Sequence, residues 1–570
     1  MAKHPALSTF YLSFLLVLPL ARVALTYRVF SETIDEPVHV AAGTEWLKNG
    51  TYTLDRQHPP LARVLFALPC VGQALSLSRQ ALSLSGQAES LSYTRAPNLL
   101  FLLLTLIGAA LWARKLAGDT AALLTLAILG ALPPLLGHAG LATTDVPVTA
   151  MIALALYCFD DWQLRPTWRN AFLTALCIGA GLLTKMSFLT LFAIGAFILI
   201  RRIPRVAQCA AMALIAAFIV WAGYRFSVGR LNDYRITTFS DATAEYQAAK
   251  YATAPGYEWV RPDIVKRYWR YTNKIGHGQM TGIDFVDWAR ASGYPSPMAG
   301  RHGDTMRGRP PVEKAHAAPF RAAYQWISVH VPMPAPEFIV GMECVRSHVY
   351  TGHMAYLFGR YSDKGWWYYF PVILFFKTPA AFLVLALIGF RYMPRHALIP
   401  AAMLVLAMTT AINIGVRHIL PMYPFLAVAA AIALLHIKRI IAIPLCAWYL
   451  IATTLAHPDY MAYFNEFALG HPERIATDSN LDWGQDLLRL GHYARSHHID
   501  YVDYFGGADW RAQVPGADEL PEDHPVSGWI AVSDMRRHFG GRDHHGITWL
   551  HAYEPVDRIG ASIWLYHIAP

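Results

Sequence analysis

The sequence has few charged residues and few cysteines for its length. Only 15% of its 570 residues are charged, whereas 55% are hydrophobic. A soluble core does not need so much apolar sequence, so the composition excludes the ordinary soluble classes and predicts a protein with many membrane spans. The six cysteines are scattered without paired spacing, which argues against a disulfide framework and against a zinc site.

The sequence also has no internal repeat and no basic domain that would indicate nucleic acid as a partner. Its net charge is +9, but much of the excess lies in short loops between apolar segments. Basic residues in such loops are explained by membrane topology. We therefore expect this protein to contact membrane lipids and not to bind nucleic acid.

Apolar windows close to the roughly 20 residues that cross a bilayer recur along the chain. They lie at 9–27, 96–113, 119–141, 146–160, 171–184, 186–200, 207–228, 368–390, 397–415, 419–437 and 440–456. They predict a polytopic α-helical membrane protein with about eleven transmembrane helices. The windows 146–160 and 171–184 are short for full spans.

Alternate short loops carry the basic residues, which are retained on the cytoplasmic side during insertion. These residues are Lys3, Arg114, Lys115, Arg165, Arg169, Arg201, Arg202, Arg205, Arg391, Arg395, Lys438 and Arg439. Their positions predict a cytoplasmic N-terminus and an uncleaved first segment. Segments 28–95, 229–367 and 457–570 then lie on the outer face.

Two of these outer segments are long enough to carry structure of their own. We expect 229–367 to be a partly ordered lid with a flexible middle at 291–312. In the tail, 483–495 has a helical pattern, and 501–505, 528–534 and 562–568 have strand patterns. The sequence thus predicts a transmembrane module over 1–456 and a small soluble extracytoplasmic α/β domain over 457–570.

Two acidic motifs follow apolar segments on the predicted outer side. They are Asp35-Glu36-Pro37 and Asp145-Val146-Pro147. Helix capping alone would explain an Asp before a Pro. Capping does not compete with chemistry, however, because an ionised Asp at an outer helix start is also placed to act as a base or a metal ligand.

Basic residues also occur where the topology does not require them. His58 and Arg63 belong to a run with a Pro-Pro start that predicts an interfacial helix, where they could meet a lipid phosphate. Further residues of this kind are Lys185, Arg225, Lys377, Arg417 and His418. Each could snorkel or pair with a carboxylate. Together they predict a cationic ring that binds a phosphate.

The sequence leaves the question of a metal open. Asp478, Asn480 and Asp482 have the spacing of a calcium loop, but Trp483 stands in place of the required Gly, so we exclude calcium there. Asp35, Glu36, His39 and Asp145 could hold a divalent cation together with substrate oxygens. The chemistry considered below does not require one.

Several stretches resemble the polyprenyl-phosphate-dependent glycosyltransferases of the GT-C class. They are DEPVHVAAGTEWLKNGTYTLDRQHPPLARVLFALP, TTDVP, GLLTK, KGWWYYFPVILFFKTP and VRHILPMYPFL. This group contains the protein O-mannosyltransferases and the lipid A aminoarabinose transferase. The likeness is strongest to a bacterial branch of family 39, which also carries a tail motif like DSNLDWGQDLLRL. It implies a multi-helix fold in the bacterial inner membrane and an active site on the periplasmic face.

The resemblance also implies roles for individual residues. Asp35 is similar to the catalytic aspartate of the family's first outer loop, Glu36 to its companion, and Asp145 to the acidic position of the second loop. Lys185 and Arg417 are weaker matches to phosphate-contacting positions. We assign His39 and His58 to substrate binding.

The implied reaction moves a sugar from a polyprenyl phosphate to a hydroxyl of a protein, lipid or glycan. Because the phosphate is already a good leaving group, the acceptor needs a base more than the donor needs an acid. We expect Asp35 to be this base and the configuration at the anomeric carbon to invert.

Two other classes remain as alternatives. A transporter or flippase also uses many helices and charges inside the membrane. Against it, the candidate residues are predicted to gather on one face and not at mid-membrane. A non-catalytic scaffold that binds envelope partners through its tail is disfavoured because both outer loops carry acidic residues.

Overall fold

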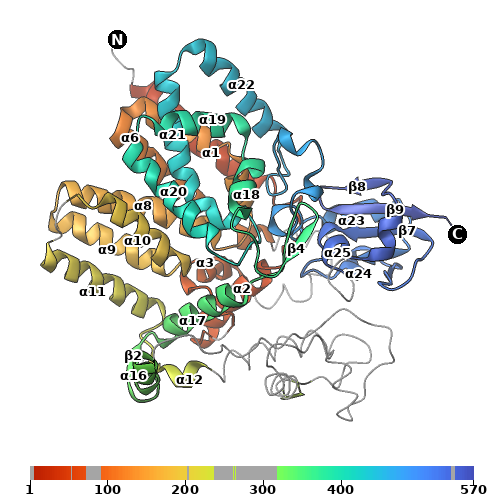
Figure 1. The fold of residues 1–570 in the computed structure, drawn as a ribbon, viewed down its shortest axis with the longest axis horizontal. Helices are drawn as coiled ribbons and strands as arrows, with labels where there is room; N and C mark the ends of the chain where they lie inside the picture. Colours follow the sequence, from red (N-terminus) through yellow and green to blue (C-terminus); the bar gives the residue numbers. More distant parts are fainter. Residues whose placement is uncertain are drawn as a thin grey trace.

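In the computed structural model the chain forms a helical bundle followed by a small mixed sheet (Figure 1). The structure describes residues 5–52, 54–71, 91–201, 205–235, 261, 263–264, 318–540 and 546–569. Most of the predicted lid, including its middle at 291–312, lies outside these residues.

The helices of the bundle follow the order of the apolar windows. Up to residue 223 they are α1 (Pro5–Ala24), α2 (Glu36–Asn49), α3 (Pro60–Val71), α6 (Asn98–Leu129), α7 (Pro133–Ala139), α8 (Asp145–Leu164), α9 (Trp168–Leu182), α10 (Ser187–Leu199) and α11 (Val206–Gly223). Later ones are α18 (Tyr369–Lys377), α19 (Ala380–Phe390), α20 (Pro394–Met408), the 3-10 helix η1 (Val416–Met422), α21 (Tyr423–His436) and α22 (Arg439–Leu455).

Every predicted apolar window falls on one of these helices or on a pair of them. By length and composition, three helices of the described residues can cross a membrane, and a bent pair would be a fourth. The three are Leu91–Leu129, Val206–Gly223 and Val416–His436. The other apolar helices are shorter or broken, so the count of about eleven spans stays a prediction.

Two breaks in the bundle have local causes. Within α6, Gly118 adopts φ 81° and ψ −173°, a conformation that side chains disfavour, and this break separates two predicted windows. The pair α18 and α19 is bent by 114°. Pro379 lies at this bend and lacks an N–H group, and it favours the extended backbone of Thr378.

Small residues let the central helices approach one another. The α21 helix packs against α6 and α19, and its residues Ala427 to Ala433 are largely alanines and are all buried. Gly389 of α19 lies so close that a Cβ added there would be 1.9 Å from the carbonyl oxygen of Ala429. Such contacts replace hydrophobic burial as the source of helix association in a membrane.

Ion pairs tie the predicted cytoplasmic loops together at one end of the bundle. Asp160 at the end of α8 pairs with Lys115 at 2.7 Å and with Arg201 at 2.9 Å. Arg395 at the start of α20 donates to the carbonyl oxygens of Ile198 and Ile200. The predicted cytoplasmic loops that follow residues 113, 160 and 200 therefore meet the loop before α20 at this end.

The segment between α11 and α18 contributes short elements. They are β1 (Val228–Arg230), α12 (Leu231–Arg235), α16 (Ala318–His330), β2 (Pro332–Pro334), α17 (Pro336–Thr351), β3 (Ala355–Leu357) and β4 (Arg360–Ser362). β1 pairs with β2 and β3 with β4, both antiparallel. The first pair links the end of α11 to the start of α17, and the second lies between α17 and α18.

The tail forms a five-stranded mixed sheet in the order β6-β5-β7-β9-β8 (Figure 1). Its elements are η2 (Glu466–Ala468), η3 (Pro472–Arg474), η4 (Asp478–Asn480), α23 (Leu487–Ala494), β5 (Tyr501–Asp503), α24 (Trp510–Gln513), β6 (Asp518–Glu519), β7 (Gly528–Ser533), α25 (Asp534–Phe539), η5 (Thr548–Ala552), β8 (Asp557–Ile559) and β9 (Ile563–Ile568). All three predicted strands are present. The predicted helix begins only at Leu487, because Trp483 to Asp486 run along the loop between α1 and α2 instead. The boundary between 456 and 457 stays a prediction.

The orientation can be tested with reporter fusions along the chain. We expect fusions at residues 75, 300 and 520 to report the outer side and a fusion at residue 203 the cytoplasm, because the basic loops are retained inside. Paired alkaline phosphatase and fluorescent-protein reporters distinguish the two sides. A cytoplasmic signal at residue 300 would separate the lid from the predicted active face and contradict this architecture.

Candidate active site

Asp35 forms an ion pair with Arg417, which lies in η1. The distance from Arg417 Nη1 to Asp35 Oδ2 is 2.7 Å, and the aspartate side chain is 34% exposed. Asp35 directly precedes α2, yet its carboxylate caps no backbone N–H among the described residues. Capping therefore does not explain this aspartate, whose side chain points across to η1.

Asp145 forms a second ion pair, with Lys185 in the turn between α9 and α10. Lys185 Nζ lies 2.5 Å from Asp145 Oδ1, and Asp145 is buried. Asp145 is the first residue of α8, and the preceding Thr144 occupies the capping position. The charge of Arg417 acts on both Asp35 and Asp145, and η1 packs against α8, so the two acidic motifs meet at η1.

Glu36 is turned away from this meeting point and is fully buried. Its carboxylate pairs with Arg95 through two bonds of 2.8 and 2.7 Å, and it accepts the N–H groups of Thr33 and Ala142, both at 2.8 Å. Burial alone would raise the pKa of Glu36, but Arg95 and these N–H groups hold it below its usual range. Glu36 thus fastens the loop between α1 and α2 to the segment before Asp145.

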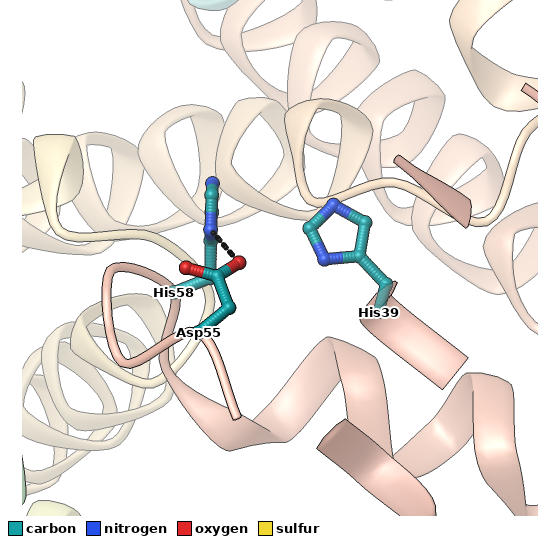
Figure 2. A group of neighbouring side chains, drawn as sticks. All are labelled: His39, Asp55 and His58. Atoms are coloured by element: carbon teal, nitrogen blue, oxygen red, sulfur yellow. Dashed lines mark hydrogen bonds and ion pairs between the residues drawn. The ribbon is translucent and has the colours of Figure 1, made fainter. Parts of the chain in front are cut away.

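His39, Asp55 and His58 form a cluster (Figure 2). One ligand atom from each lies within 4.8 Å of the others. The charges of Asp145 and Lys185 act on the histidines of this cluster. Asp55 Oδ2 accepts from His58 Nδ1 at 3.1 Å and from Arg63 Nη2, while Arg63 Nε donates to His39 Nδ1 at 2.9 Å. Arg63 therefore supplies the positive charge that a metal would supply, and the cluster does not fit a metal in this form.

The charges within the cluster agree with this interpretation. Burial opposes the charge of Asp55, yet Arg63 and His58 hold its pKa well below the usual range. Burial, followed by Arg63, holds the pKa of His39 well below its usual range. His39 is therefore a neutral imidazole that accepts at Nδ1 and has its proton on Nε2. His58, one-quarter exposed, is oriented by Asp55.

The carboxylates that the sequence offered for a cation each pair with a different protein cation. Asp35 pairs with Arg417, Glu36 with Arg95 and Asp145 with Lys185. His39 is bound to Arg63. The set Asp35, Glu36, His39 and Asp145 thus contains no uncommitted carboxylate pair that fits a divalent cation.

The structure brings together only part of the predicted cationic ring. Lys185, Arg417 and His418 lie close enough to influence one another electrostatically. Lys377 is completely buried, and its ammonium donates to the carbonyl oxygens of Met461 and Asn480, both at 2.6 Å. It therefore anchors the tail and does not face a ligand.

Arg63 and Arg225 also lie outside the ring. Arg63 is buried and its donors are used by Asp55, His39 and nearby carbonyl oxygens. Arg225 stacks on Trp46 with its Cζ 4.3 Å from the ring centroid. Trp46 belongs to the far end of α2 from Asp35, so Arg225 does not reach the acidic residues.

The sequence did not identify the contribution of the tail to this site. The indole of Trp483 lies under Arg417, with the guanidinium carbon 4.3 Å from the ring centroid. Asp478 attracts the same arginine and has a left-handed backbone, with φ 59°. His138 of α7 is buried beside Trp483, and neither of its ring nitrogens has a hydrogen-bond partner in the described part of the chain.

Comparison with known proteins bears on residues 12–222, which include both acidic motifs. They match the family described as dolichyl-phosphate-mannose-protein mannosyltransferase, over somewhat more than a third of the chain. This match confirms the resemblance stated from the sequence. The chain is a membrane glycosyltransferase with many helices. No curated protein matches the sequence.

Among solved structures, the chain is similar to ArnT from Cupriavidus metallidurans bound to undecaprenyl phosphate. The identity is 11% and the TM-score 0.44, over 99% of this chain and 98% of that one. It is also similar to the oligosaccharyltransferase AglB from Archaeoglobus fulgidus in complex with an inhibitory peptide and a dolichol-phosphate. There the identity is 12% and the TM-score 0.43, over 96% and 72% of the two chains.

The opposite roles of Asp35 and Glu36 give a prediction about stability. We expect Glu36→Gln to lower the free energy of unfolding by about 3–5 kcal/mol, because Arg95 would stay buried without its charge partner. Asp35→Asn is the matched control and should cost less than about 1 kcal/mol, since Asp35 is partly exposed and Asn can still accept from Arg417. Thermal unfolding in detergent measures both. Equal losses in the two variants would contradict the division of roles.

Proposed function

We propose that this protein transfers a sugar from a polyprenyl phosphate to an acceptor hydroxyl on the extracytoplasmic face of the bacterial inner membrane. The observation that carries the proposal is the meeting of two ion pairs, Asp35 with Arg417 and Asp145 with Lys185, at the end of the bundle away from the basic loops. A carboxylate for the acceptor and cations for a phosphate are thus side by side. Charges gathered at one end suit transfer better than passage through the membrane.

Asp35 is the proposed base. Only its Oδ2 is hydrogen bonded among the described residues, so Oδ1 is available to the hydroxyl of an acceptor. In the step, Asp35 takes the hydroxyl proton while the acceptor oxygen bonds to the anomeric carbon, and the bond from that carbon to the phosphate oxygen breaks. Because attack comes from the side opposite the phosphate, the anomeric configuration inverts.

Arg417, His418 and Lys185 are the proposed donor-binding residues. Arg417 Nε and His418 Nε2 are buried and have no hydrogen-bond partner among the described residues. Buried polar atoms without partners are uncommon and point to a missing ligand or water. Phosphate oxygens would satisfy these nitrogens, and the charge that develops on the leaving phosphate would be stabilised by Arg417 and Lys185.

Asp145 and the histidine cluster have supporting roles in this proposal. Asp145 holds the Lys185 ammonium in place at 2.5 Å. His58 is held by Asp55 and lies near Lys185, whose charge it experiences. We therefore place His58 at the substrate. His39 instead accepts a hydrogen bond from Arg63 and so helps to hold the first loop in place. Glu36 positions Asp35 through the backbone and does not touch the substrate.

The base can be tested by a single substitution. We expect Asp35→Asn to lower the rate of sugar transfer by about 10²- to 10⁴-fold, because Asn cannot take a proton. Asp145→Asn should also be severe, since Lys185 loses its partner. Transfer of radiolabel from polyprenyl-phosphate sugars to acceptors in membrane extracts measures both and also identifies the donor sugar. Near-normal turnover by Asp35→Asn would show that another group is the base.

The donor site gives a separate prediction. Arg417→Ala and Lys185→Ala should each remove about 1.5–3 kcal/mol of binding, or roughly 10- to 150-fold in donor kcat/KM, with less effect on the acceptor KM. Arg225→Ala is the matched control, because that arginine stacks on Trp46 away from the site. A nucleotide sugar should not replace the lipid-linked donor. An unchanged donor kcat/KM in both variants, or efficient use of a nucleotide sugar, would overturn the mechanism.

A further inference from the structure

The tail segment Trp483–Leu487 lies against the first outer loop just before Asp35. The N–H of Ile34 donates to the carbonyl oxygen of Trp483 at 3.1 Å, and the N–H of Ser31 to that of Gln485 at 2.9 Å. Ser31 Oγ donates to the carbonyl oxygen of Gly484 at 2.8 Å and accepts from the N–H of Leu487 at 3.0 Å. The backbone of Trp483 therefore holds the residue next to Asp35.

The side chain of Trp483 holds the partner of Asp35. Its indole is buried, and the Cζ of Arg417 lies 4.3 Å from the ring centroid. Stacking of this kind occupies the face of the guanidinium and leaves the N–H groups at its edge free to donate. One of these donates to Asp35, and Nε has no partner among the described residues. Trp483 thus holds the residue before Asp35 through its backbone and contacts Arg417 through its ring.

The residues before Trp483 fix the backbone around Arg417. The N–H of Val416 donates to Asn480 Oδ1 at 3.0 Å, and Ser479 Oγ donates to the carbonyl oxygen of Ile414 at 2.6 Å. Asn480 is itself held by the buried ammonium of Lys377. The segment that carries Trp483 is therefore hydrogen bonded to the backbone just before Arg417.

The outer sheet supports Trp483 from the other side. Asp482 accepts the N–H of Met535 at the start of α25, at 2.8 Å. Asp486 accepts the hydroxyl and the N–H of Ser562 at 2.9 and 3.0 Å, just before β9. Both carboxylates are buried. Trp483 lies between these two attachments, so its position is set by the sheet as well as by the helical bundle.

We propose that Trp483 is a positioning residue that holds Arg417 in the orientation in which its edge serves both Asp35 and the donor phosphate. The inference rests on the proposed function of Arg417 as a donor-binding residue. It makes the segment 478–487 a part of the catalytic unit, and the outer sheet its support, although the sequence placed both in a separate soluble domain.

A double-mutant cycle tests this role. Trp483→Leu removes the aromatic face, Trp483→Phe keeps one, and each is made alone and together with Arg417→Ala. Trp510→Leu is the matched control, because Trp510 of α24 is a buried tryptophan in the hydrophobic core of the tail. The arginine that stacks on its ring is Arg511, at 4.5 Å, and not Arg417. The full-length protein in detergent is assayed for binding of a polyprenyl monophosphate, for donor kcat/KM and for thermal stability.

We expect Trp483→Leu to weaken phosphate binding and donor kcat/KM by about 10- to 100-fold, because a displaced arginine misplaces the donor. Trp483→Phe should lose less than about fivefold, since a phenyl ring still stacks on a guanidinium. In the Arg417→Ala background the same leucine substitution should add less than about twofold. Trp510→Leu should lower stability and leave donor binding unchanged.

Equal losses from Trp483→Leu in the presence and absence of Arg417 would overturn the inference, and so would a Trp510→Leu variant that binds donor as poorly as Trp483→Leu. Failure of the proposed function has a different signature. If the wild-type protein binds polyprenyl phosphate but transfers no sugar, the transferase mechanism fails, while the binding cycle still decides the role of Trp483.

Discussion

The buried pair of Glu36 and Arg95 is the contact on which the arrangement of the site depends. Its carboxylate binds the guanidinium twice and also accepts the N–H of Ala142, three residues before Asp145. Arg95 in turn donates to the carbonyl oxygens of Phe30 and Ser31. One pair therefore joins the loop between α1 and α2, the start of the long α6 segment and the turn before α8. Because removing one partner of a buried pair leaves an uncompensated charge, the relative positions of these three segments all depend on this one pair.

The parts that sequence reasoning predicted well depend on local pattern. The apolar windows fall on helices because the hydrophobic length needed in a bilayer is a property of a continuous stretch of chain. Asp35 and Asp145 were singled out because both acidic motifs were expected at helix starts on one face of the membrane, and the structure places both at helix starts. Their roles in the reaction stay predictions. The strands of the tail were found from alternation. Their pairing order, with β7 between β5 and β9, required the structure.

The parts that it missed depend on partners far away in the sequence. Lys377 lies in an apolar segment, and such a lysine suggests a ligand. Its three donors are instead used by backbone carbonyl oxygens more than 80 residues away and by the ring of Phe464. Arg63 was also expected to bind a lipid phosphate, but His39 and Asp55 accept hydrogen bonds from the donors that a phosphate would need. The residue types were identified from the sequence, but their partners are set by tertiary contacts.

The contact between Trp483 and Arg417 connects the sheet to the chemistry through the shape of the guanidinium. A lysine has a single charged point, so a group that holds it also covers part of its donor surface. Arginine has a face and an edge, and a ring on the face leaves the edge to Asp35 and to a ligand. The tail can therefore hold Arg417 in place without covering the edge that binds Asp35. It follows that a shift of the segment Trp483–Leu487 would reach Arg417 first through the angle of one side chain, before the helical bundle itself is disturbed.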